Sequence, residues 1–183
     1  GVELLGAGGI AADAEVVALA VESLLAAGLV DFQVCLGQVD FISGIMAEAE
    51  LDEALSHKVK QALVERNMVG LGELLAECRV ESGNRELLQQ LPMLHGKLDM
   101  LQSVRRRVKN EISQAALDNL ADIYQLLEKY GIDRHVMFDL GIIRDFDYYT
   151  GMVFETYTAG LGYPICGGGR YDRMAGFFGR EQP

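Results

Sequence analysis

The chain has 183 residues, of which 50% are hydrophobic and 23% charged, a composition typical of a globular protein with a sizeable core. Its formal net charge of -11 and sequence pI of about 4.7 argue against a nucleic-acid-binding surface over the whole chain, although a local basic patch remains compatible with them. Cys35, Cys78 and Cys166 are odd in number and widely spaced, so the sequence indicates neither a disulfide framework nor a zinc site. We therefore expect no bound metal.

The sequence shows no signal peptide and no long apolar segment, so we expect a cytoplasmic location and no membrane contact. The length fits one domain with an appendage, or two small domains. Because the chain begins at Gly1 rather than Met, we expect it to be a fragment of a longer protein.

The first 40 residues predict a helix followed by a strand. Apolar residues recur at helical spacing over residues 13–29, with Asp13 as the expected N-cap and Gly28 as the expected end. Apolar and polar residues alternate over residues 31–39, which is typical of a half-buried strand. Residues 1–5, "GVELL", are expected to end another strand.

Residues 41–112 differ from both ends of the chain. Short amphipathic helices, separated by Gly, Asn and Ser, are predicted there, and no strand is expected to interrupt them. Such a segment between the strands of one sheet is interpreted as an all-helical insertion. The domain division is therefore a core of residues 1–40 and 113–183 with a helical insertion of residues 41–112.

The last 71 residues return to mixed structure. A helix is predicted over residues 112–131, ending at Gly131. Three strands are expected to follow, with "AGLG" as the turn between the last two. The order of elements predicts an α+β fold, an antiparallel sheet with helices on one side.

The segment "RDFDYYTGMVFE", residues 144–155, carries more hydrogen-bonding groups than a strand needs for folding. Strand alternation predicts one face with Tyr149, Gly151, Val153 and Glu155. Gly151 has no side chain, so a ligand could approach the backbone beside Tyr149. The alternative is that these residues are simply good strand formers.

The segment "GGGRYD", residues 167–172, is the second unusual stretch. Its glycines permit backbone conformations closed to other residues, and a loop here could present N–H groups to an anion at the start of a helix near Tyr171. The segment matches neither a P-loop nor a Rossmann fingerprint. The alternative is a flexible turn.

Together, these two segments resemble the histidine-specific signature of histidyl-tRNA synthetases, which reads Arg-Gly-Leu-Asp-Tyr-Tyr-x-x-x-Phe-Glu and then Gly-Gly-Arg-Tyr-Asp. The opening "GVELLG" resembles the strand that follows motif 2 of that family. The predicted helices of residues 41–112 fit the position of the family's helical insertion. The resemblance implies a class II aminoacyl-tRNA synthetase-like antiparallel sheet flanked by helices.

Two classes of protein share this signature: the synthetases and the regulatory subunits of ATP phosphoribosyltransferase in histidine biosynthesis. The chain resembles the second class more closely, because Asp145 and Phe146 stand where synthetases have Gly and Leu. Arg173 likewise stands where synthetases usually have Gly. A carboxylate at position 145 would weaken an anion site at Arg144 by repulsion and by pairing with the arginine.

The resemblance implies a non-catalytic subunit that binds free L-histidine for feedback control and needs no cofactor. It implies assembly with a short-form ATP phosphoribosyltransferase catalytic subunit, as a homodimer within a hetero-oligomer, with no catalytic residue from this chain. The alternative is a catalytic-domain fragment of a histidyl-tRNA synthetase. The parts that separate the two classes, including motif 3 and an anticodon-binding domain, lie outside this sequence.

By the same resemblance, six residues are expected around a bound histidine: Glu3, Arg144, Tyr149, Gly168, Gly169 and Tyr171. A carboxylate and phenol hydroxyls suit the imidazole, while an arginine or a glycine N–H suits the ligand carboxylate. Tyr148 is expected in the core. A single glutamate near a strand end is more often merely exposed, and this alternative remains open for Glu3.

The run "SVRRRVKN", residues 103–110, is the most basic part of the chain. It could contact a phosphate backbone. A solvated helix face, or a contact with an acidic partner subunit, is the commoner explanation of such a run. Nucleic-acid binding is therefore not expected.

Overall fold

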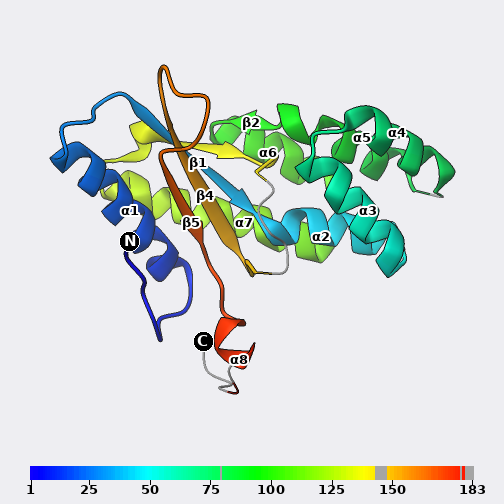
Figure 1. Ribbon diagram of the computed structural model, residues 1–183, viewed down its shortest axis with the longest axis horizontal. Helices are drawn as coiled ribbons and strands as arrows, with labels where there is room; N and C mark the ends of the chain where they lie inside the picture. Colours follow the sequence, from blue (N-terminus) through cyan, green and yellow to red (C-terminus); the bar gives the residue numbers. More distant parts are fainter. Residues whose placement is uncertain (79, 143–147, 178, 180–183) are drawn as a thin grey trace.

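The computed structural model describes residues 1–78, 80–142, 148–177 and 179. A five-stranded sheet with the strand order β2-β3-β1-β4-β5 lies in front of α1 and α7, while α2 to α6 extend to one side (Figure 1). The predicted α+β class is confirmed.

The strands are β1 Phe32–Gln38, β2 His95–Gly96, β3 Val136–Asp139, β4 Met152–Thr158 and β5 Cys166–Gly169. The helices are α1 Ile10–Ala26, α2 Val39–Glu48, α3 Glu53–Val64, α4 Met68–Glu77, α5 Ser82–Gln90, α6 Leu98–Arg107, α7 Glu111–Lys129 and α8 Met174–Phe177.

The sheet is mixed rather than wholly antiparallel. β1 pairs with β4 in the antiparallel direction, and β4 pairs likewise with β5. β1 and β3 are parallel, with Val34 opposite Val136. The long connection through α2 to α7 makes this pairing possible, because parallel neighbours need a crossover rather than a tight turn.

The main core lies between the sheet and the two helices behind it. Val34 and Leu36 of β1 are fully buried there, together with Val17 of α1 and Leu120 of α7. α7 begins where the Asn110 side chain accepts a hydrogen bond from the backbone N–H of Ser113, as an N-cap residue does. The core therefore fixes α1 and α7 against one face of the sheet.

The other face of β1 is also buried, so the prediction of a half-buried strand is wrong. Cys35 is 7% exposed and packs with Val39, Ile142 and Val153 in a second, smaller apolar cluster. A buried cysteine behaves as a small apolar side chain. Counting Cys35 among the polar positions of the alternating pattern therefore gave the wrong prediction for this face of the strand. Burial raises the pKa of its thiol to about 12.

The predicted helices of residues 41–112 are present as α2 to α6, but one strand interrupts them. His95 and Gly96 form β2, which pairs with Asp139 and Phe138 of β3 at the edge of the sheet. The expectation of no strand here is wrong, because two residues are too few for an alternating pattern. The division into a core and an inserted domain stays an interpretation.

The beginning of the chain differs most from the prediction. Residues 1–9 form neither a helix nor a strand, so the strand expected for "GVELL" is wrong. Their apolar side chains Val2 and Leu5 are 61% and 73% exposed. α1 begins after Gly9, and Asp13 is a buried residue of the helix rather than its N-cap.

Candidate functional site

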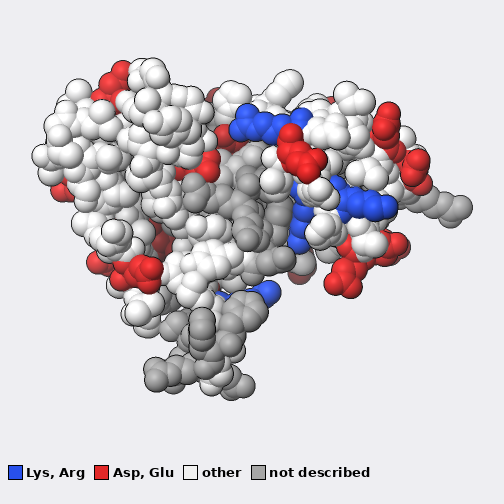
Figure 2. All heavy atoms as spheres, viewed as in Figure 1, with Lys and Arg blue, Asp and Glu red and all other residues white. Residues whose placement is uncertain are grey.

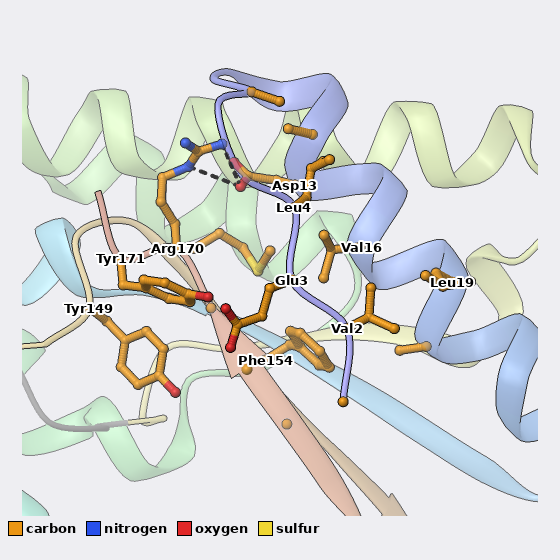
Figure 3. Close-up of a pocket in the computed structure, with 18 of the residues that line it drawn as sticks. Val2, Glu3, Leu4, Asp13, Val16, Leu19, Tyr149, Phe154, Arg170 and Tyr171 are labelled. Atoms are coloured by element: carbon orange, nitrogen blue, oxygen red, sulfur yellow. Dashed lines mark hydrogen bonds and ion pairs between the residues drawn. The ribbon is translucent and has the colours of Figure 1, made fainter. Parts of the chain in front are cut away.

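A cavity of about 530 Å³ lies between residues 1–7, α1 and the adjoining ends of β4 and β5 (Figure 3). Its volume falls within the 300–1,000 Å³ usual for small-molecule sites. One wall is apolar, with Val16 and Leu19 of α1 facing Phe154 of β4. The polar groups gather at the other end, where Glu3 and Tyr171 lie side by side.

Glu3 and Tyr171 form the centre of the polar end. The Tyr171 pKa is raised to about 12, first because burial disfavours the phenolate and second because the hydroxyl hydrogen-bonds to the Glu3 carboxylate. The Glu3 side chain is exposed, yet its carboxylate points into the cavity (Figure 3). The pair therefore presents a charged acceptor and a neutral phenol to the same space.

Two further tyrosines extend this polar end. The Tyr148 ring stacks on that of Tyr171, with centroids 5.2 Å apart, and meets the Tyr149 ring edge-on at 4.9 Å. Both line the cavity, so the expectation that Tyr148 belongs to the core is wrong. The three rings form a continuous aromatic wall beside Glu3.

The glycines of "GGGRYD" have a different role from the one predicted. Residues 167–169 belong to β5 rather than to a loop, and none of them has a positive φ. A Cβ on Gly168 would lie 3.1 Å from the Phe154 ring, and one on Gly169 would lie 2.8 Å from the Tyr149 ring. Glycine is therefore needed here for close packing, and the helix that follows begins only at Met174.

Gly151 likewise makes room for a side chain of the protein. A Cβ there would lie 3.0 Å from Cδ of Arg170, so the space expected for a ligand is occupied by that arginine. The strand face predicted to meet a ligand is also wrong. Met152 and Phe154 line the cavity, whereas Val153 packs in the apolar cluster on the opposite face.

Sequence reasoning missed the ion pair that closes one end of the cavity. Arg170 Nη2 lies 2.9 Å from Asp13 Oδ1, and the two side chains are 16% and 8% exposed. Burial raises the pKa of Asp13, and the hydrogen bond and charge of Arg170 oppose that rise. The partners are 157 residues apart, so no local spacing signals the contact.

The structure brings together five of the six residues predicted to bind a ligand. Glu3, Tyr149, Gly168, Gly169 and Tyr171 all line the cavity. Arg144 lies outside the described residues, as does Asp145 beside it. The assignment of these residues to a ligand stays a prediction.

The basic run lies mainly on α6, next to acidic side chains. Arg105 pairs with Asp118 at 2.8 Å, and Lys109 pairs with Glu81 at 2.9 Å. Figure 2 shows that, on the face drawn, most Lys and Arg lie over the half of the molecule formed by α2 to α6, with Asp and Glu interleaved.

Among the helices of the described residues, none has the length and apolar character that a membrane span requires.

Comparison with known proteins identifies the family. The family model described as histidyl-tRNA synthetase matches residues 1–183, which is the whole chain. The chain belongs to the histidyl-tRNA synthetase family. Its closer resemblance to the regulatory subunits than to the synthetases is confirmed by relatives named "ATP phosphoribosyltransferase regulatory subunit". Those from Moorella thermoacetica and Halothermothrix orenii are each 43% identical over the whole chain, and the chain spans 47% and 44% of their respective lengths.

Solved structures agree with this assignment. A crystal structure described as an ATP phosphoribosyltransferase regulatory subunit/histidyl-tRNA synthetase from Bacillus halodurans is 34% identical and superposes with a TM-score of 0.88. The match covers 97% of this chain and 47% of that one. The histidyl-tRNA synthetase from Nostoc sp. PCC 7120, 21% identical, has a TM-score of 0.80 over 95% of this chain and 43% of that one, and shares the fold.

Proposed function

We propose that this histidyl-tRNA synthetase family chain forms part of a regulatory subunit of ATP phosphoribosyltransferase and binds free L-histidine for feedback control. The observation that carries the proposal is the cavity in which the Glu3 carboxylate and the Tyr171 hydroxyl converge beside an apolar wall. The names of the relatives from Moorella thermoacetica and Halothermothrix orenii support the regulatory role.

The chemistry of the cavity suits an imidazole ring. Glu3 can accept a hydrogen bond from a ring N–H, and the Tyr149 hydroxyl can bond to the other ring nitrogen. The aromatic wall and the α1 side chains Val16 and Leu19 offer an apolar surface for the ring faces. Arg144 or an N–H of Gly168 or Gly169 is assigned to the ligand carboxylate by the family resemblance.

The proposed subunit works as part of a cytoplasmic assembly. A solved complex from Thermotoga maritima, described as ATP phosphoribosyl transferase (HisG:HisZ), has a TM-score of 0.70 against this chain at 16% identity, which establishes a shared fold. We infer that a short-form catalytic subunit is the partner, that the regulatory subunit is a homodimer in the assembly, and that it contributes no catalytic residue or cofactor.

Calorimetry on the full-length protein tests histidine binding. The parent is expected to bind L-histidine and to ignore ATP, and histidine at a hundredfold excess over Kd should stabilise it by about 2.7 kcal/mol. Tyr149→Phe should weaken binding by about 1 kcal/mol and Glu3→Gln by about 1.5–3 kcal/mol, because the second change removes a charged acceptor. Tyr163→Phe is the matched control, since Tyr163 is 63% exposed and does not line the cavity.

The proposal fails if the parent binds no histidine, or if Tyr149→Phe and Glu3→Gln both bind it like the Tyr163→Phe control. In that case the signature residues serve the architecture of the sheet.

A histidyl-tRNA synthetase is the second candidate, because the family model that matches the whole chain carries that description. The test is pyrophosphate exchange by the full-length protein with ATP and L-histidine. We expect no exchange, since Asp145 places a carboxylate next to the arginine that would otherwise face a phosphate. Robust exchange would replace the regulatory proposal with the synthetase.

A further inference from the structure

The residues that carry the aromatic wall lie beyond the ends of two paired strands. β4 begins at Met152, and β5 ends at Gly169. Tyr148 and Tyr149 precede the first of these strands, and Tyr171 follows the second. The regular pairing of β4 with β5 therefore ends before it reaches the three rings, and other contacts must hold these two segments together.

Two backbone hydrogen bonds continue the pairing past the strand ends. The Arg170 N–H donates to the Met152 carbonyl oxygen, and the Thr150 N–H donates to the Arg170 carbonyl oxygen, both at 2.8 Å. The register of β4 with β5, continued in the same direction, sets Thr150 opposite Asp172. Side chains directly opposite each other on paired strands are close enough to interact.

Thr150 and Asp172 bond to each other at this point and form a clasp between the two segments. The Thr150 hydroxyl oxygen accepts from the Asp172 N–H at 3.0 Å, and the hydroxyl donates to Asp172 Oδ2 at 3.2 Å. The Arg170 carbonyl oxygen, another acceptor within reach, lies farther away at 3.5 Å. A hydroxyl that donates to a carboxylate makes a stronger hydrogen bond than one that donates to a neutral group.

The carboxylate of the clasp is itself held by charged side chains. Asp172 Oδ1 accepts from Arg170 Nη1 at 3.0 Å. The same guanidinium donates from Nε to Asp13 Oδ1 at 3.0 Å (Figure 3). Asp13 is buried on α1, a helix whose Val17 and Val21 are fully buried in the main core. The clasp is therefore connected to a fixed part of the fold.

The clasp lies next to the residues that carry the three rings. Thr150 directly follows Tyr149, and Asp172 directly follows Tyr171. The Tyr148 ring contacts both segments, because it stacks on the Tyr171 ring and meets the Tyr149 ring edge-on. A change in the spacing of the two segments would therefore change how the rings lie against one another.

We propose that Thr150 is a positioning residue, whose hydroxyl holds Tyr149 and Tyr171 in the arrangement that receives an amino-acid ligand. The ligand part of this inference rests on the proposed function. The positioning part concerns the free protein and stands on the hydrogen bonds between Thr150 and Asp172 and on the ring contacts beside them.

Thr150→Val in the full-length protein tests the role of the hydroxyl. Valine keeps the β-branched shape of threonine and removes both hydrogen bonds of the clasp. We expect the Kd for L-histidine to rise about fivefold, the factor that corresponds to the net contribution of one typical hydrogen bond. In protein labelled with fluorotyrosine, we also expect the fluorine NMR resonances of Tyr148 and Tyr171 to shift, because the stacked rings move relative to each other.

Thr150→Ser and Thr158→Val are the matched controls. Serine keeps the hydroxyl and loses only the methyl group, so it should retain the parent Kd and the parent fluorine spectrum. Thr158 belongs to the same strand β4, and its hydroxyl donates to the Asp31 carbonyl oxygen at 2.7 Å, but it does not line the cavity. Thr158→Val removes a comparable hydrogen bond and should leave both measurements unchanged.

Three results would overturn the inference. If Thr150→Val lowers the melting temperature but keeps the parent Kd and the parent ring resonances, Thr150 is only a structural residue. If Thr150→Ser behaves like Thr150→Val, the methyl group rather than the hydroxyl is responsible. If the ring resonances shift while the Kd stays at the parent value, the ligand part of the inference is wrong.

The fluorine spectrum separates this inference from the proposed function. If the parent binds no histidine, the proposed function fails, while the ring resonances of Thr150→Val still decide the positioning role. Should Thr150→Val fail to fold, Asp172→Ala is read by the same two measurements with the same criteria, because it removes the carboxylate acceptor of the clasp and keeps the Thr150 side chain.

Discussion

Gly169→Ala is expected to damage both the sheet and the cavity. A Cβ at this position would lie 2.7 Å from the Met152 carbonyl oxygen, 2.8 Å from Tyr149 Cδ1 and 2.8 Å from Val153 Cγ1. Carbon atoms in contact normally lie about 3.5–4.0 Å apart, so several tenths of an ångström must be gained on three sides. The carbonyl oxygen belongs to the backbone and Val153 is fully buried, which leaves Tyr149 as the group most able to move.

We expect a loss of about 1–3 kcal/mol in the local free energy of unfolding, the usual cost of overpacking. Hydrogen exchange of the β4 and β5 amides measures it, because exchange reports on opening of the segment itself. The displaced Tyr149 ring should raise the Kd for L-histidine about tenfold, as misplacing a site group commonly does.

Gly162→Ala is the control for Gly169→Ala. Gly162 has nothing within 4 Å of an added Cβ and no positive φ, so alanine there should be neutral or stabilise by about 0.4–1 kcal/mol. The reasoning is refuted if Gly169→Ala exchanges its amides and binds histidine like the parent.

Two further predictions concern the pH response and the core. The Tyr171 pKa is raised to about 12, so the contribution of this tyrosine to stability should be complete below pH of about 10 and be lost as the pH rises from about 10 to about 12. Glu3→Gln should narrow this pH window, which melting curves of both proteins across the range would show. An identical window in both proteins would contradict the contribution of Glu3 to the raised pKa. His135 is buried, stacks on Phe32 with ring centroids 4.4 Å apart and accepts a hydrogen bond from Arg134 Nε at 3.0 Å. Because His135→Ala removes these contacts, it should lower the free energy of unfolding by about 1–3 kcal/mol. Urea unfolding measures this loss, with His57→Ala as the control because His57 lies on the more accessible side of α3 and makes no such stack. Equal stability of the two variants would contradict a stabilising role for the His135–Phe32 stack.

Regular periodicity predicted most of the elements correctly. α7 and the strands β1, β3, β4 and β5 are all present near the predicted positions, because each carries enough residues to show its period. The two-residue strand β2 could not be recognised, since its identity comes from pairing with β3. The expected strand at residues 1–5 fails for the complementary reason, because apolar residues alone do not make a strand without a hydrogen-bonded neighbour.

The candidate site was found through motifs, and its geometry could not be predicted from them. The signature identified Tyr149, Gly168, Gly169 and Tyr171, which the structure brings to one cavity with Glu3. Sequence alone could not show that the glycines pack against aromatic rings in a strand, since a run of glycines equally suits a loop.

The contact of Arg170 with Asp13 was equally hidden from sequence reasoning. Asp13 looked like an N-cap because it precedes an apolar stripe, but the helix begins earlier and turns that carboxylate towards β5. Side chains that meet only through the tertiary fold leave no trace in local spacing. Such contacts required the structure.

The most direct test of the histidine-site account is a crystal structure of the full-length protein with L-histidine. The account predicts that the ligand lies in the cavity, with an imidazole nitrogen within hydrogen-bonding distance, about 2.7–3.2 Å, of the Glu3 carboxylate and the ring against the tyrosine wall. Histidine bound at another place, or a cavity left without ligand at saturating histidine, would contradict it.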